Sequence, residues 1–141
     1  MMNVTSSPLK AAKLTGLAVV AAGFAAFASP ALAAEAGVAA SGQFTGASDH
    51  ITTGGVTIVK TANGGAVVIL DSDFSLDGAP DPRVGFGADG VYASESDLGP
   101  LTSKTGIQVY IVPPSVDVDD FNEVYIWCRK FAVPLGVASL N

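Results

Sequence analysis

The chain has very few residues that can carry redox or metal chemistry. It contains one cysteine, Cys128, and one histidine, His50, in 141 residues. A single cysteine excludes an intramolecular disulfide, and a zinc site needs more Cys and His ligands than this chain has. A hydrolase based on Cys128 and His50 would also need a nucleophile elbow or an oxyanion site, and no motif supplies either. In an exported chain, an odd cysteine indicates a free thiol, a cofactor ligand or an intermolecular bond.

Cations are also scarce. Seven Lys and Arg face 13 Asp and Glu, so the formal net charge is −6. An acidic chain repels nucleic acid and anionic membrane surfaces, so we expect neither as a partner. A basic partner protein would suit this charge, and improved solubility is the alternative explanation.

No apolar run is long enough for a typical membrane span of about 20 residues. The longest run, Leu14–Ala28, follows Lys10 and Lys13 and ends at Ser29-Pro30. Ala31-Leu32-Ala33 then offers the small-x-small pattern of a signal peptidase site. We therefore predict a cleavable signal peptide at residues 1–33, an uncleaved anchor being the alternative. The mature protein would be periplasmic or extracellular and would have no stable membrane anchor.

Helical periodicity is missing after residue 33. Short alternating or apolar runs are separated by Gly, Pro and Asp turns, which is typical of antiparallel β proteins. We predict a flexible lead-in at 34–41, followed by an all-β domain at 42–141. This domain would be an antiparallel β-sandwich or a partly open barrel of about eight short strands. The expected strands include 43–46, 55–60, 66–70, 83–86, 106–112, 124–131 and 133–140.

Acidic clusters give no clear metal motif. Asp71-Ser72-Asp73 begins like a calcium loop, but Leu76 and Pro82 stand where that loop needs Gly and Glu. The acidic group at 117–120 is more typical of a solvated turn.

The run 124–131 contains the only cysteine and the only tryptophan, side by side. Side chains alternate along a strand, so Val124, Ile126, Cys128 and Lys130 would share one face and Trp127 would lie on the other. The apolar neighbours favour an inward-facing Cys128, whereas Lys130 would place a cation near the thiol. The residues alone leave open whether Cys128 is a redox group or ordinary core.

An ordered set of blocks through residues 43–140 resembles the electron-transfer DM-thirteen domain family, a single-cysteine β module found beside DOMON and b-type cytochrome modules. The matching positions are Phe44, Gly46, His50, 54–58, Phe74, 80–84, 98–101, 106–113, 126–131 and 136–138. Gly85-Phe86-Gly87 and Pro113-Pro114 depart from the family pattern, so irregular strand edges are expected at these two places.

The resemblance implies that Cys128 acts as a redox thiol or as a ligand to a prosthetic group such as haem. Trp127 and His50 would then be candidate neighbours of that site, and no metal other than haem iron is expected. Because no DOMON or cytochrome module is attached, a redox or surface protein partner would be met in trans. The chain would be an electron-transfer or redox accessory module rather than a stand-alone enzyme.

Two other interpretations follow from the same residues. In one, the chain is a non-catalytic extracellular binding or adhesion module whose cysteine is structural. In the other, Cys128 links two chains into a dimer.

Overall fold

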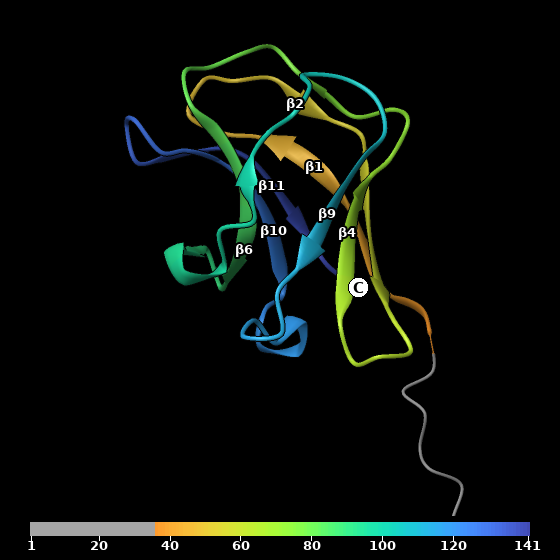
Figure 1. Cartoon of the computed structure of the whole chain (residues 1–141). Coiled ribbons are helices and arrows are strands. Elements are labelled where there is room, and N and C mark those ends of the chain that lie inside the picture. The colour runs from red at the N-terminus through yellow and green to blue at the C-terminus, as the bar shows by residue number, and fades with distance from the viewer. Residues whose placement is uncertain (1–35) are drawn as a thin grey trace, which may run out of the picture.

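A computed structural model describes residues 36–141 of the chain (Figure 1). The predicted signal peptide at 1–33 lies outside the described residues. No helix in the described part is long and apolar enough to cross a membrane.

Apart from two short 3-10 helices, all regular secondary structure in the described chain is β-strand, which confirms the all-β prediction. The strands are β1 (Gly37–Gly46), β2 (Thr52–Thr53), β3 (Gly55–Lys60), β4 (Ala66–Leu70), β5 (Ser75–Leu76), β6 (Pro82–Ala88), β7 (Val91–Ala93), β8 (Gly99–Pro100), β9 (Gln108–Val112), β10 (Glu123–Cys128) and β11 (Val133–Ser139). Two short 3-10 helices, η1 (Ser94–Ser96) and η2 (Val118–Asp120), interrupt the connections.

Nine strands form one curled antiparallel sheet. Eight of them follow the order β7-β6-β10-β11-β1-β3-β4-β9, β8 pairs with β6, and β2 and β5 form a separate small sheet. In Figure 1, β6 and β10 lie on one side and β4 on the other, with β9 crossing the front. Of the two predicted alternatives, a β-sandwich and a partly open barrel, the structure shows the barrel, because a single sheet curls around the core.

The β3–β4 hairpin forms where the sequence predicted it, with the same strand ends. Asn63-Gly64-Gly65 turns the chain, and Gly64 adopts a φ of +82°, a conformation that costs glycine little. The uniformly apolar sequence of β4 predicts a central strand covered on both faces. Ala66, Val68 and Leu70 are buried, but Val67 and Ile69 on its outer face are only half-buried, so the core covers one face and not two.

β1 begins earlier than predicted and joins the two halves of the sheet. Residues 37–41 were expected to be a flexible lead-in, but the segment from Gly37 to Gln43 pairs with β3. The following residues, Phe44 to Gly46, pair with β11 near the end of the chain. Alanine and glycine give little pattern by themselves, so this pairing could not be read from residues 37–41 alone.

The concave side of the sheet holds one hydrophobic core. Its members come from both halves of the sheet and include Cys128: Phe44, Val56, Ile58, Ala66, Val68, Leu70, Phe74, Leu76, Val84, Phe86, Tyr110, Val112, Val124, Ile126, Cys128, Leu135 and Ala138. Phe121 closes part of the open side, because its ring stacks on Phe86 at a centroid distance of 5.4 Å.

Candidate functional site

Cys128 is the last residue of β10, between β6 and β11. Its backbone lies opposite Pro82 on one side and Val133 on the other. Cys128 is 1% exposed, and its same-face neighbours Val124 and Ile126 are fully buried. The predicted inward orientation is confirmed.

A short segment before β6 covers the thiol. The Cys128 S–H donates a hydrogen bond to the Pro80 carbonyl, with an Sγ–O distance of 3.1 Å. The next residue, Arg129, is tied to Asp81 twice: its backbone N–H donates to the Asp81 carbonyl, and its Nε donates to the Asp81 carboxylate at 2.7 Å. We call Pro80, Asp81 and Arg129 the latch. A reagent that attacks the sulfur must displace this latch or another part of the core.

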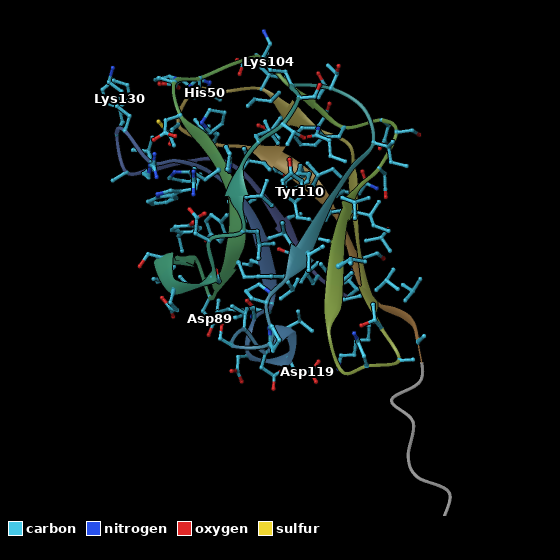
Figure 2. The ribbon with its side chains drawn as sticks, in the orientation of Figure 1. His50, Asp89, Lys104, Tyr110, Asp119 and Lys130 are labelled. Atoms are coloured by element: carbon cyan, nitrogen blue, oxygen red, sulfur yellow. The ribbon has the colours of Figure 1, made fainter. Side chains whose placement is uncertain are left out.

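Lys130 is not on the Cys128 face, so that prediction is wrong. The strand ends at Cys128, and residues 129–132 form an exposed turn in which Ala132 has a φ of +51°. Figure 2 shows Lys130 on a loop that projects from the sheet. Its Nζ lies 5.5 Å from the centroid of the Phe131 ring. Strand alternation stops where the chain turns, so it could not place Lys130.

His50 lies in the loop before β2 and binds Asp77. Its Nδ1 is 3.0 Å from the Asp77 carboxylate, which also accepts a hydrogen bond from the Ile51 backbone N–H. The Ile51 hydrogen bond, followed by the His50 contact, holds the pKa of Asp77 below its usual value. Figure 2 shows His50 and Lys130 near the same end of the molecule. No hydrogen bond joins His50 to Cys128 in the described chain, and the His50 contacts indicate a structural role in this loop.

Trp127 faces away from the core, on the opposite side of β10 from the thiol. Its indole stacks on the ring of Tyr92 from β7, with centroids 4.3 Å apart and planes 10° from parallel. Tyr125 packs against both, with centroids 5.7 Å from Tyr92 and 6.3 Å from Trp127. We call Tyr92, Tyr125 and Trp127 the aromatic cluster. Trp127 is half-exposed, whereas Tyr125 is 3% exposed because the cluster covers it.

Each tyrosine of the cluster donates its phenolic hydrogen to a carboxylate. Tyr92 donates to Asp97 at 3.3 Å, and two nitrogens of Arg83 hold the same carboxylate. Tyr125 donates to Glu123 at 3.0 Å. Sequence reasoning missed Tyr92, which reaches Trp127 only when β7 pairs with β6, and Asp97, which accepts the Tyr92 hydrogen bond.

These contacts shift three pKa values. Burial, followed by the negative charge of Asp97, raises the pKa of Tyr92 well above its usual value. Burial, followed by the hydrogen bond to Glu123, raises the pKa of Tyr125 to about 12. Burial alone would raise the pKa of Asp97, but hydrogen bonds from Arg83 and the Gly99 backbone outweigh it and lower that pKa. Both phenols therefore stay protonated, and Asp97 ionised, at neutral pH.

The surroundings of Cys128 do not fit a haem. A thiolate axial ligand needs an open position at sulfur and a space for the macrocycle, whereas this sulfur is buried and its hydrogen is directed at the Pro80 carbonyl. Two surface hollows of the described chain lie elsewhere: one is lined by residues including Lys60, Pro113 and Asp119, the other by residues including Gln43 and Asn141. Within residues 36–141, no three His, Cys, Asp or Glu side chains are grouped to hold a metal ion.

Comparison with known proteins supports the family resemblance seen in the sequence. A family model described as "Electron transfer DM13" matches residues 43–140, a range that includes Cys128 and the whole aromatic cluster. No curated protein and no solved structure matches the chain. Because the family model covers most of the sequence, the chain belongs to the DM13 electron-transfer domain family.

Proposed function

We propose that the protein is an exported electron-transfer module whose Cys128 exchanges single electrons with a redox protein met in trans. The observation that carries this proposal is the electron-transfer family match over residues 43–140, which contains the only cysteine of the chain. The buried position of the sulfur supports a role that protects a reactive sulfur species from solvent.

The electrons and protons balance when the partner is a metalloprotein that accepts or donates one electron at a time. In the oxidising direction, Cys128 gives one electron to the partner's metal, and the oxidation state of that metal falls by one. The thiol proton is released to solvent when the latch opens, and the sulfur is left as a thiyl radical. One electron from a donor and one proton from water restore the thiol.

A second candidate function is a non-catalytic extracellular binding module in which Cys128 is structural. The burial of the thiol and its hydrogen bond to Pro80 favour this candidate, because buried cysteines commonly act as small apolar core residues. An accessible cofactor site is not needed in this case.

Anaerobic titration of the native mature protein with hexachloroiridate(IV), a strong one-electron oxidant, separates the two functions. If Cys128 is the redox group, wild type takes up one equivalent more per chain than a Cys128→Ser variant with an unchanged circular dichroism spectrum. Uptake by wild type only after denaturation, or equal uptake by both native proteins, contradicts the electron-transfer role. A non-reducing gel run on the same samples reports whether the oxidised sulfur has formed a Cys128-linked dimer.

Export is tested separately by expressing the full chain in a bacterial host and sequencing the N-terminus of the mature protein. We expect a periplasmic or secreted product that begins at Ala34. A cytoplasmic product that retains residues 1–33 contradicts export.

A further inference from the structure

We propose that the aromatic cluster is a one-electron relay site on the outer face of the sheet, which connects Cys128 with the redox partner. The link to Cys128 rests on the proposed function, whereas the redox activity of the cluster does not. The cluster gathers the only tryptophan and two of the three tyrosines of the chain. Indole and phenol are the protein side chains, besides thiols, that give up single electrons most readily.

The first argument is the spacing of the rings. Trp127 and Tyr92 are stacked in direct contact, and Tyr125 touches both rings from the side. Electron tunnelling weakens steeply with distance, so three oxidisable rings in mutual contact exchange an electron far faster than rings that are spread over the sheet. Trp127 and Tyr92 are both half-exposed, so a partner docked on this face can reach the stack directly.

The second argument is that β6 is shaped to hold these rings. A Cβ atom added at Gly85 would lie 2.8 Å from the Tyr92 ring, and one added at Gly87 would overlap the Tyr125 ring. The rings therefore occupy the space that side chains at Gly85 and Gly87 would need.

The third argument concerns the proton. A phenol that loses an electron becomes a strong acid and must release its proton. When Tyr92 gives one electron to an acceptor, the phenolic proton moves along the existing hydrogen bond to the Asp97 carboxylate. The products are a neutral tyrosyl radical, a protonated Asp97 and an acceptor reduced by one electron. An electron returned from the donor side brings the proton back. Glu123 offers Tyr125 the same partner. Asp97 acts through Tyr92 and is a positioning residue, held in place by Arg83.

The fourth argument is the place of the cluster relative to the thiol. Trp127 and Cys128 are consecutive, so one peptide link separates the outer stack from the buried sulfur. The partner therefore need not reach the sulfur, because the electron crosses the sheet at this point. This arrangement reconciles a sulfur that is sealed from solvent with electron exchange in trans.

Flash oxidation tests the relay on the folded mature protein. A ruthenium(II) polypyridyl photosensitiser with a sacrificial electron acceptor produces a ruthenium(III) oxidant, and transient absorption then follows tryptophanyl and tyrosyl radicals. In wild type we expect a tryptophanyl signal that converts into a tyrosyl signal. The double variant Tyr92→Phe and Tyr125→Phe loses the tyrosyl signal and keeps a longer-lived tryptophanyl one. Tyr110→Phe is the matched control, because Tyr110 (labelled in Figure 2) is buried, donates to Gln108 and pairs with no ring of the cluster.

A tyrosyl signal that persists in the double variant, or that disappears in the Tyr110→Phe control, overturns the relay. Asp97→Asn preserves the shape of the side chain but removes the proton acceptor, so it slows formation of the tyrosyl radical. An unchanged rate contradicts the role of Asp97.

The link to Cys128 has its own measurement. The cluster radicals form in the Cys128→Ser variant as they do in wild type, but they live longer, because no thiol refills the oxidised ring. Equal lifetimes overturn the connection to Cys128 and count against the proposed function, while radical formation within the cluster still supports its redox activity.

Discussion

The latch makes a quantitative prediction about how quickly the thiol reacts in the native state. Cys128 is 1% exposed, so a thiol reagent attacks it only in the fraction of molecules in which the latch is open. Asp81→Asn removes the carboxylate that pairs with Arg129 Nε at 2.7 Å. Asparagine tolerates the left-handed φ of +51° that Asp81 adopts, so the backbone is not strained further.

The magnitude follows from the exposure of the pair. The Arg129 side chain is 61% exposed and that of Asp81 is 32% exposed, so solvent screens their attraction. Exposed ion pairs contribute about 0.2–1 kcal/mol, which corresponds to an increase in the open fraction of about 1.4- to 5-fold. The rate of reaction with Ellman's reagent under native conditions should rise by the same factor.

Asp49→Asn is the matched control. Asp49 is exposed, has a φ of +63°, and undergoes the same loss of charge, but Arg129 pairs with Asp81 and not with Asp49. Its variant should react at the wild-type rate. The reasoning is refuted if both variants react equally fast, or if wild-type Cys128 reacts at the rate of an unfolded chain.

Three further changes test the packing around the sheet. Gly87→Ala places a methyl group against the Tyr125 ring and should cost about 1–3 kcal/mol in denaturant unfolding, whereas Gly37→Ala, with open space around it, should be nearly neutral. Ser96→Ala removes the buried hydroxyl that accepts from the Phe86 N–H, and should lower stability by about 1–3 kcal/mol; a loss within experimental error would mean that another group satisfies that N–H. The pKa of Tyr125 is raised to about 12 in the folded chain, so the unfolded chain loses this proton first and the free energy of unfolding falls as the pH rises from about 10 to 12. Tyr125→Phe should make this decline less steep when unfolding is measured at alkaline pH. An unchanged slope would contradict the raised pKa of Tyr125.

Much of the sheet could be predicted from local patterns. β3 and β4 alternate or are uniformly apolar between strong turn residues, and both their ends match the structure. The inward orientation of Cys128 followed from its apolar neighbours, Val124 and Ile126. These features depend on residues close in the sequence, where period-two alternation is informative.

Features created by strand pairing could not be predicted. Tyr125 lies on the outer face of its strand and is buried because Tyr92 comes from β7, more than 30 positions earlier in the chain. Gly85 and Gly87 departed from the family pattern and suggested irregular strand edges, yet β6 runs continuously through both of them. Only the pairing of β7 and β10 with β6 shows that these two glycines leave room for the rings of Tyr92 and Tyr125.

The role of β1 has a consequence for how the chain is made. Its first part pairs with β3, which is synthesised soon afterwards, but its last part waits for β11, where Phe44 meets Ala138. A chain that emerges N-terminus first therefore completes its sheet only after β11 has appeared. Until then β1 lacks one of its two strand partners.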